Sequence, residues 1–302
     1  MARVVETAKA INISTDQKLL LVEPQEFIID GQDVKEPIGM SGIRLEAKVH
    51  IVTGAQSAAE NIIKCVRRCG LEVEQLMLNP LASSLAVLTD DEKELGVAMV
   101  DIGAGTTDVA IFTNGAIRHT AVIPIAGDLI TSDIAMALRT PTKDAEDIKV
   151  ESGFAKQLLA DPDQQVEVPG LGDRGPRMLS RQVLAGVIEP RIEEIFSLVQ
   201  QVVRESGYEE VLSSGIVLTG GSCVMPGMVE LGEDIFLKPV RRGNPKYYGA
   251  LSDMVALPRA ATVMGLLEEA RLARLRGFKV AQKNGSMKTA FSQIRDWFVG
   301  NF

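Results

Sequence analysis

The fold is decided by the stretch Val97-Ala-Met-Val-Asp-Ile-Gly-Ala-Gly-Thr-Thr-Asp-Val-Ala-Ile-Phe112. The apolar run over residues 95–101 predicts a buried strand, and the chain returns as a second strand over residues 108–112. Asn114-Gly115 is a hairpin signal, so a third strand is expected over residues 116–124. Together these segments predict buried antiparallel strands, the first two joined by a turn that holds two glycines.

The glycine turn is a candidate site for the phosphates of a nucleotide. Glycines let backbone N–H groups approach a phosphate closely, because no Cβ intrudes. Two threonines can add hydroxyl donors, and two aspartates can hold hydrated Mg²⁺. A lone GxG turn would be an ordinary hairpin, but the buried strand and the flanking aspartates favour a binding site. The candidate nucleotide-binding residues are Asp101, Gly103, Gly105, Thr106, Thr107 and Asp108, with Asp101 and Asp108 as the metal ligands.

Two later segments carry weaker signals of the same kind. A short buried strand over residues 216–218 runs into Gly220 and Gly221, which would let a flat base or a phosphate lie against the backbone. Glu146 and Lys149 share one face of a predicted helix. An exposed helical ion pair would have the same spacing, so this second signal depends on the others.

The remaining pattern mixes helices and strands. Such a mixture in this order predicts an α/β protein with more than one sheet. Strands are expected at 11–14, 19–22, 26–29, 45–52 and 71–78, and helices at 57–68, 81–88, 127–138 and 144–159. A loop is expected at 161–177, a long helix from Pro190 to Gly207, and a last helix at 259–276.

Composition limits the classes of function. The chain has 302 residues and a net charge of −8. Seven cations and one acid from Arg271 onward give this segment +6, which leaves −14 on the preceding residues. Because nucleic-acid binding depends on neutralising phosphates, an acidic body does not suit it. A basic tail on an acidic body favours contact of the tail with an anionic surface. Neither a secretory signal nor an apolar stretch long enough to span a membrane is visible in the sequence, so a cytoplasmic location is expected.

The cysteines and histidines are expected to be structural. Cys65, Cys69 and Cys223 form neither a CxxC pair nor a zinc pattern, so we expect all three to be packing residues. His50 and His119 fall in strand-like runs without a nearby group of ligands.

Taken together, the hairpin, the Gly220-Gly221 turn and the Glu146/Lys149 helix resemble the superfamily of actin, heat-shock chaperones and sugar kinases. The resemblance implies ATP with Mg²⁺ as cofactors: phosphates at the hairpin, adenosine over the glycine pair, and base and ribose beside Glu146 and Lys149. It also implies a role for Gly127, at the start of a connecting helix. The implied fold is an actin-like ATPase (ribonuclease-H-like) α/β fold with two sheet-containing halves, the first half incomplete, and a C-terminal amphipathic helix.

Within this superfamily the chain resembles the FtsA family of bacterial cell-division proteins over nearly its whole length. The segments that carry this resemblance include Leu21-Val-Glu-Pro-Gln-Glu-Phe27, Arg118-His-Thr-Ala-Val-Ile-Pro124 and Val187-Ile-Glu-Pro-Arg-Ile-Glu-Glu194. The family tethers the ring protein FtsZ to the membrane. The implied partners are the C-terminal peptide of FtsZ, further copies of the chain in a polymer, later division proteins and anionic inner-membrane lipids. The implied location is the cytoplasmic face of the bacterial inner membrane at the division septum.

The FtsZ peptide is expected to bind near Arg177, Arg181 and Arg191, since these cations suit its acidic groups and C-terminal region. Basic residues beside a helix are also often merely solvated. The resemblance divides the chain into 1–53 (small subdomain), 54–93 (rest of the first half), 94–141 with 190–254 (nucleotide-binding subdomain), 142–189 (inserted small subdomain), 255–276 (closing helix), 277–285 (linker) and 286–302 (membrane-targeting helix).

The sequence departs from the family at two places. An earlier phosphate hairpin of the form D-x-G-T/S does not precede Asp101 here, so we expect the chain to begin inside the small subdomain and to have reduced nucleotide affinity. The heat-shock relatives carry a Glu before the proline of a helix start, where this chain has Asn79-Pro80. We therefore name no catalytic residue and expect at most weak ATP hydrolysis.

The tail has one apolar helical face. Apolar residues recur at helical spacing after Gly285, which follows a linker-like stretch over residues 277–285. The candidate membrane-binding residues are Met287, Lys288, Phe291, Ile294, Arg295, Trp297 and Phe298. A helix docked on the body is the alternative; the linker and the basic flank favour a helix lying in a membrane interface.

Two other classes of protein remain as alternatives. An actin-like pilus-assembly protein would share the fold but should lack this tail and the Val-Ile-Glu-Pro-Arg helix segment. A sugar- or acetate-kinase-type phosphotransferase would need a substrate-binding domain and a catalytic Asp or Arg near the first phosphate loop, and no candidate is evident in the sequence.

Overall fold

The computed structural model describes residues 2–10, 12–172, 174–247 and 249–276. The chain divides into two units, residues 1–266 and 267–302. Of the second unit only residues 267–276 are described, and they carry α10 to its end at Leu275. The predicted linker and membrane-targeting helix, residues 277–302, therefore lie outside the described residues.

The first part of the chain forms a three-stranded antiparallel sheet with strand order β2-β1-β3. A tight turn at Asp30 and Gly31, both with positive φ, joins β1 to β2. Two of the predicted short strands, 19–22 and 26–29, are one continuous strand, and the predicted strand at 11–14 is not found over residues 12–14. The elements are α1 (Ala2–Lys9), β1 (Gln17–Ile29), β2 (Gln32–Val34) and β3 (Leu45–Ala55).

Three helices connect this sheet to the next. They are α2 (Gln56–Arg68), α3 (Asn79–Val87) and α4 (Asp90–Leu95). α3 begins with Pro80 in its first turn, a position that needs no backbone donor. The prediction of a strand over residues 71–78 is wrong, because this segment has neither helical nor strand structure. Its apolar residues satisfy a strand pattern, but none of them pairs with another strand.

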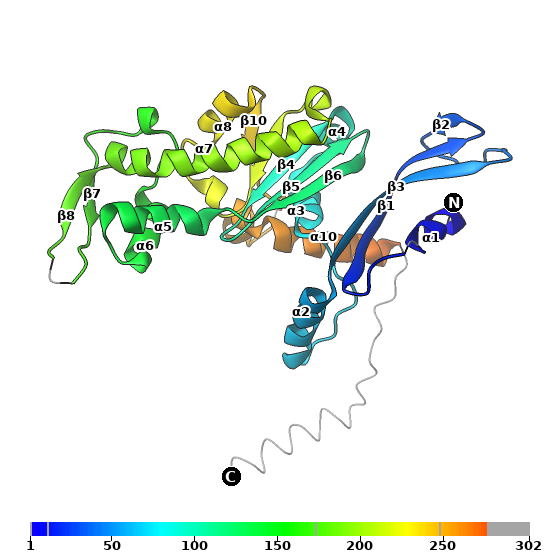
Figure 1. Ribbon diagram of the computed structural model, residues 1–302, viewed down its shortest axis with the longest axis horizontal. Coiled ribbons are helices and arrows are strands. Elements are labelled where there is room, and N and C mark those ends of the chain that lie inside the picture. The colour runs from blue at the N-terminus through cyan, green and yellow to red at the C-terminus, as the bar shows by residue number, and fades with distance from the viewer. Residues whose placement is uncertain (1, 11, 173, 248, 277–302) are drawn as a thin grey trace, which may run out of the picture. The chain divides into compact units, whose positions relative to one another are not determined.

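The second sheet has five strands in the order β10-β9-β4-β5-β6 (Figure 1). β5 pairs antiparallel with β4 and β6, whereas β9 runs parallel to β4 and β10. The strands are β4 (Val97–Ile102), β5 (Thr107–Thr113), β6 (Ala116–Ile123), β9 (Ile216–Thr219) and β10 (Val240–Arg242). The predicted hairpin is confirmed: Asn114 and Gly115 both take the positive φ that such a tight turn requires.

The remaining elements lie between and after these strands. The first are α5 (Gly127–Leu138), α6 (Thr142–Ser152), the 3₁₀ turn η1 (Gln157–Leu159), β7 (Gln165–Val168), β8 (Arg177–Ser180) and α7 (Arg181–Glu205). They are followed by η2 (Glu209–Val211), η3 (Ser222–Val224), α8 (Met228–Phe236), α9 (Ser252–Val255), η4 (Pro258–Ala260) and α10 (Ala261–Leu275).

Two predictions in this region are wrong. Pro190 does not open a helix; it lies inside α7, which starts at Arg181 because the Ser180 side chain accepts a hydrogen bond from the Val183 N–H. A serine cap ten residues earlier thus outweighs the proline signal. The loop predicted over residues 161–177 contains β7, which pairs antiparallel with β8. Four-residue strands among prolines and glycines give too short an alternation to detect.

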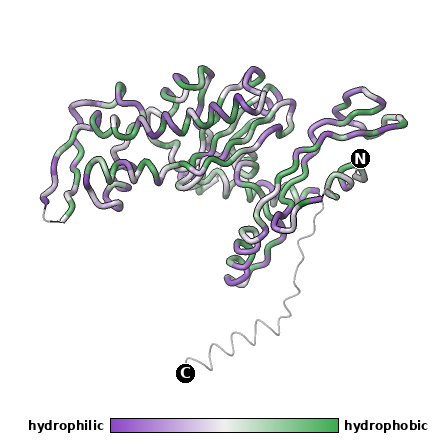
Figure 2. The backbone as a smooth tube through the Cα atoms, viewed as in Figure 1, coloured by the Kyte–Doolittle hydropathy of each residue, from purple (hydrophilic) through white to green (hydrophobic). Residues whose placement is uncertain are grey.

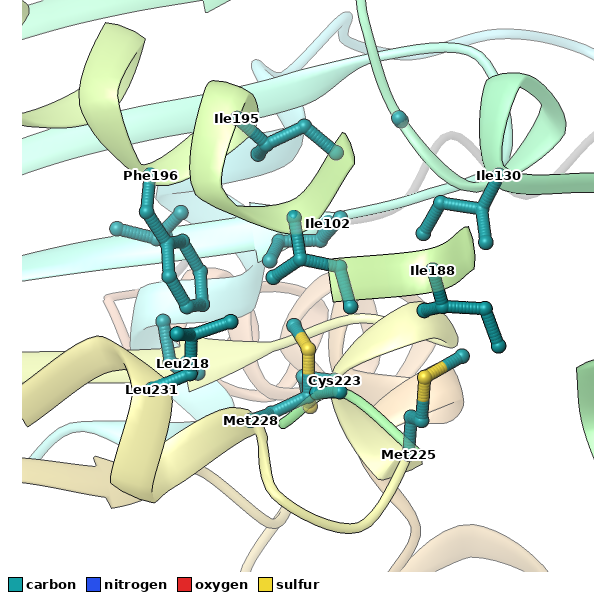
Figure 3. Close-up of a cluster of buried hydrophobic side chains, with 14 of the residues drawn as sticks. Ile102, Ile130, Ile188, Ile195, Phe196, Leu218, Cys223, Met225, Met228 and Leu231 are labelled. Carbon is teal, nitrogen blue, oxygen red and sulfur yellow. The ribbon is translucent and has the colours of Figure 1, made fainter. Parts of the chain in front are cut away.

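Helices cover both faces of the five-stranded sheet. On one face Ala98, Val100 and Ile102 pack with apolar side chains of α5, α7 and α8, as the close-up in Figure 3 shows around Ile102. On the other face Val97 and Met99 pack against α3 and the start of α10. Every residue of β4 and β5 is buried, so the sheet is the centre of the core. Figure 2 shows that β4 is hydrophobic over most of its length, whereas hydrophobic and hydrophilic residues are mixed along β3.

The cysteine prediction holds for one residue of three. Cys223 is buried in the core and shown in Figure 3, whereas Cys65 and Cys69 are exposed near the end of α2. In the part of the chain that the structure describes, no helix combines the length and apolarity needed to cross a membrane.

Candidate functional site

Two aspartates face each other across the β4–β5 hairpin. Asp101 is the direct partner of Asp108 in the antiparallel register, and both side chains are buried. Burial raises the pKa of Asp101 above its ordinary value. Burial, and then the charge of Asp101, raises the pKa of Asp108 to about 6. Two ionised carboxylates this close repel each other, so the pair suits a cation that neutralises both.

The donor set of this pair fits Mg²⁺. That ion binds through one or two carboxylates and keeps several waters or phosphate oxygens. Within the described ranges, no three His, Cys, Asp or Glu side chains gather into a group that could hold a metal. Asp101 and Asp108 would therefore supply the protein's share of an open coordination sphere rather than a closed cage.

Hydroxyl groups from two helices hold one oxygen of Asp101. The Ser83 hydroxyl donates to Asp101 Oδ2 at 2.6 Å, and the Thr262 hydroxyl lies 3.4 Å from the same oxygen. Ser83 is on α3 and Thr262 on α10. Both contacts were missed by sequence reasoning, although two adjacent serines in the apolar helical run 81–88 were a visible signal.

The turn after β4 is tied to the first residues of α5. The Gly103 N–H donates to the Thr106 carbonyl at 2.9 Å and closes the turn. The Gly127 N–H donates to the Gly103 carbonyl at 3.1 Å, and the Asp128 N–H donates to the Ala104 carbonyl at 2.8 Å. The Ser222 hydroxyl also donates to the Gly103 carbonyl, at 2.9 Å, a contact that no local sequence pattern indicated. The helix start thus positions the turn.

Lys149 is buried beside the same helix start. Its ammonium group donates to the Gly127 carbonyl at 3.1 Å and to the Thr131 hydroxyl at 2.8 Å. It also forms an ion pair with Glu146 at 2.6 Å, and the Thr131 hydroxyl donates to that carboxylate as well. The predicted pair Glu146/Lys149 therefore exists, and it joins α6 to α5 directly behind the glycine turn.

Gly220 touches Asp101 from the end of β9. It has a φ of +88°, and a Cβ there would lie 2.5 Å from Asp101 Oδ1 and would overlap the Ile102 carbonyl oxygen. No other residue type fits this position without displacing the backbone. The Gly220 turn and the β4–β5 hairpin are thus in direct contact.

Gly105 and Gly221 differ from Gly220. Neither has a positive φ. A Cβ at Gly105 would meet nothing within 4 Å, and one at Gly221 would only reach the Cβ of Arg259 at 3.8 Å. The protein's own packing therefore does not require glycine at these two exposed positions. A ligand lying close against the backbone would require it.

The two predicted threonines have different surroundings. Thr106 is exposed, and its hydroxyl lies 3.3 Å from Asp108 Oδ2. Thr107 is fully buried, and its hydroxyl donates to the Ile125 carbonyl at 2.7 Å. The structure therefore brings Asp101, Gly103, Asp108, Gly127, Lys149 and Gly220 together, whereas the Thr107 hydroxyl is used inside the fold.

The three predicted peptide-binding arginines all have partners within the chain. Arg191 makes two contacts with the carboxylate of Asp133, at 2.6 and 3.1 Å, and a third contact with Glu194. Arg181 donates to the carbonyls of Ser152 and Gly153 at 2.9 and 3.2 Å.

Arg177 is exposed on β8 and donates to the Leu138 carbonyl. Among the residues described, no carboxylate pairs with it. Its charge is therefore the most accessible of the three. The predicted membrane-binding residues, from Met287 to Phe298, lie outside the described residues.

Comparison with known proteins agrees with this architecture. The family model described as Cell division protein FtsA matches residues 98–265, and the model described as SHS2 domain inserted in FTSA matches residues 1–53. The chain is 52% identical to the cell division protein FtsA of Pseudomonas aeruginosa, over 99% of this chain and 74% of that protein. It is 44% identical to FtsA of Escherichia coli K12, with the same coverage.

Solved structures of low sequence identity show the same fold. MreB5 of Spiroplasma citri bound to ADP matches with a TM-score of 0.58 and 20% identity, over 74% of this chain and 68% of that one. The PilM–PilN type IV pilus biogenesis complex matches with a TM-score of 0.61 and 17% identity, over 89% and 70%.

The sheet, the hairpin at its centre and these structural likenesses define an actin-like α/β fold, as the sequence predicted. Within that class the chain belongs to the FtsA family of cell division proteins, since the family model spans more than half of it and close relatives match almost all of it.

Proposed function

We propose that this chain binds ATP with Mg²⁺ at the hairpin and acts in cell division by attaching FtsZ polymers to the cytoplasmic face of the inner membrane at the septum. The observation that carries the nucleotide site is the buried pair Asp101 and Asp108, which face each other across the hairpin, together with Gly105 and Gly221, where the protein's own packing does not require glycine. The similar MreB5 was solved with ADP and with AMPPNP, which supports the same class of ligand here.

Two neighbouring glycines test the nucleotide site. Gly221→Ala should leave the unfolding midpoint unchanged, because the new Cβ has room, but should weaken binding of a fluorescent ATP analogue if a ligand lies against this backbone. Gly220→Ala should lower both stability and binding, because of its positive φ and the contact with Asp101. Wild-type-like binding by Gly221→Ala would contradict the proposed position of the ligand.

Attachment to the membrane rests on the tail sequence. Its apolar face and basic residues suit an interfacial helix, which binds reversibly as a single copy and more strongly in a polymer. Trp297 is the chain's sole tryptophan and reports on it. We expect a blue shift of its emission with anionic vesicles, and pelleting that Trp297→Glu abolishes. Unchanged emission and no pelleting of the native chain would contradict the anchor.

The surroundings of Arg177 and Arg191 differ, and this difference predicts which of the two matters more for binding of the FtsZ peptide. Arg177 donates to the Leu138 carbonyl and pairs with no carboxylate among the described residues, whereas Arg191 is already paired with Asp133. We expect Arg177→Ala to weaken binding of a labelled FtsZ C-terminal peptide more than Arg191→Ala does. Equal and wild-type-like affinities would place the peptide elsewhere. A vesicle flotation assay then tests peptide binding and membrane binding together. The labelled FtsZ peptide should float with the vesicles when the native chain is present, and should not when the Trp297→Glu variant replaces it.

The two alternative classes have less support. Membership in the FtsA family separates the chain from pilus-assembly proteins, whose likeness here is one of fold alone. The same membership argues against a sugar- or acetate-kinase-type phosphotransferase. We propose self-assembly into polymers as the role of nucleotide binding, with slow hydrolysis, and interaction with later division proteins as a consequence of that assembly.

A further inference from the structure

Ser83 makes an unusual contact for a helical serine. Its neighbour Ser84, equally buried on α3, donates back to the Leu81 carbonyl at 2.8 Å within the same helix. Such local bonding is the common arrangement for a serine inside a helix. Ser83 instead crosses to the sheet and donates to Asp101 Oδ2 at 2.6 Å. A fully buried hydroxyl with a short bond to a carboxylate is one of the strong hydrogen bonds of a protein interior.

Thr262 reaches the same point from a different helix. Its hydroxyl oxygen lies 3.0 Å from that of Ser83 and 3.4 Å from Asp101 Oδ2. The two helices are close enough for this because Gly265 on α10 packs directly on the backbone of α3, where a Cβ would overlap the Ala82 carbonyl. Two helices that are far apart in sequence thus deliver hydroxyls to one carboxylate oxygen.

The two oxygens of Asp101 consequently have different surroundings. Oδ2 accepts from the two hydroxyls, whereas Oδ1 lies beside Gly220. Within the described residues, no hydrogen bond reaches Oδ1. Fixing Oδ2 therefore fixes the direction of Oδ1, which lies beside Gly220. Asp108 is the direct partner of Asp101 across the same hairpin.

We propose that Ser83 and Thr262 are positioning residues that orient Asp101 for the Mg²⁺ of the nucleotide site. The inference rests on the proposed function, because it assigns a role toward the metal that accompanies the nucleotide. Hydrogen-bond partners of metal-binding carboxylates typically contribute 10–100-fold to metal affinity. Neither residue touches the nucleotide in this assignment, so their loss should act on the metal and spare the nucleotide's own contacts.

The experiment compares Ser83→Ala with Ser84→Ala in the full chain. Both remove one buried hydroxyl from the same helix, but only the first removes a contact with Asp101. The measurement is the Mg²⁺ concentration that gives half-maximal binding of a fluorescent ATP analogue, together with binding in EDTA. We expect Ser83→Ala to raise the Mg²⁺ midpoint about tenfold and to leave binding in EDTA unchanged. Ser84→Ala should leave both unchanged.

Thr262 supplies a second, independent pair. Thr262→Val should raise the Mg²⁺ midpoint, by less than Ser83→Ala because its distance to Asp101 is longer. Thr262→Ser keeps the hydroxyl and should restore the wild-type midpoint. This pair carries the test if Ser83→Ala does not fold.

The outcomes separate the two claims. If the native chain shows Mg²⁺-dependent binding and the Ser83 and Ser84 variants have equal midpoints, the positioning role is overturned and the proposed function stands. If the native chain binds no nucleotide at any Mg²⁺ concentration, the proposed function fails, and the inference fails with it.

Discussion

The two larger sheets of this protein have opposite burial. In the five-stranded sheet every residue of β4 and β5 is buried. In the three-stranded sheet Phe27 is the one buried residue of β1, and β3 is at most half-buried throughout. The five-stranded sheet has helices on both faces. In the three-stranded sheet most side chains of β1 and β3 are partly buried, and exposed side chains lie among them.

This difference in burial determines how clearly a polar residue indicates a functional site. Asp101, Asp108, Thr107 and Thr219 are buried polar residues on the central strands β4, β5 and β9, whose other residues are apolar except for Thr113 at the far end of β5. Burying such groups costs free energy unless they are paired, so their presence needs a reason, and in this sheet they gather where β4 and β9 end and β5 begins. In the three-stranded sheet, polar side chains are frequent and half-exposed, so no single one indicates a site.

The largest expected effect contrasts two isoleucines. Ile111 on β5 is fully buried, whereas Ile51 on β3 is half-buried. Ile111→Ala should lower the free energy of unfolding by about 2–5 kcal/mol, because it leaves a cavity between packed helices and strands. Ile51→Ala should cost clearly less, about 1 kcal/mol, because solvent and neighbouring side chains can fill the space. Urea denaturation measures both, and equal losses would mean that the two sheets are equally covered in solution.

The second prediction concerns the pH dependence introduced by Asp108. Its pKa is about 6 in the folded chain against an ordinary 3.8. Between these values the folded state holds a proton that the unfolded state has released, so stability falls as pH rises through this window. Above pH 6 the cost is fully present. Asp108→Asn should therefore stabilise the chain at pH 7.5 by about 1–3 kcal/mol in EDTA, and have little effect at pH 4.

The control for this prediction is Mg²⁺. If Asp108 is a metal ligand, added Mg²⁺ and ATP should stabilise the native chain at pH 7.5 and should not stabilise Asp108→Asn to the same extent. A variant that is less stable than the native chain at both pH values would show that the carboxylate is a favourable part of the fold.

The β4–β5–β6 part of the five-stranded sheet could be predicted from the sequence, because several local signals agree there. Long apolar runs, Asn114-Gly115 and the glycine turn all indicate the same hairpin. Prediction was wrong where one strong signal stood alone. Pro190 suggested a helix start, but the Ser180 cap begins α7 earlier. Residues 71–78 have the apolar content of a strand, yet strand pairing depends on a neighbour that the local sequence does not specify.

For the candidate site, the sequence indicated the glycines and aspartates but not what holds them. Ser83, Ser222 and Thr262 come from three separate segments, and their contacts depend on how α3, η3 and α10 pack. Lys149 reaches the start of α5 through the Gly127 carbonyl. Tertiary contacts of this kind have no local pattern, so only the structure could show them.

A third prediction tests the seam between the two sheets. Arg118 on β6 is buried and donates to Glu26 on β1 at 2.9 Å and to the Thr113 hydroxyl at 3.0 Å. Arg118→Met should lower the free energy of unfolding by about 1–2 kcal/mol, because two hydrogen bonds of a charged group are lost. It should also speed hydrogen exchange in β6. Arg44→Met, which breaks the exposed ion pair of Arg44 with Glu46 on β3, is the control and should do neither. Unchanged exchange in β6 for Arg118→Met would show that apolar contacts alone hold this seam.

The smallest effect is expected for the second ion pair that joins the two regions. Lys35, in the segment after β2, contacts Glu94 on α4, but the two side chains are 76% and 48% exposed. An exposed pair gains little, because water screens the attraction and two long side chains must be ordered. Lys35→Ala should therefore change the free energy of unfolding by less than about 0.5 kcal/mol, and added salt should leave the difference between variant and native chain near zero. A loss of more than 1 kcal/mol that salt removes would mean that this surface pair contributes as much as the buried Arg118 contact. Burial would then fail to explain which contacts between the sheets matter.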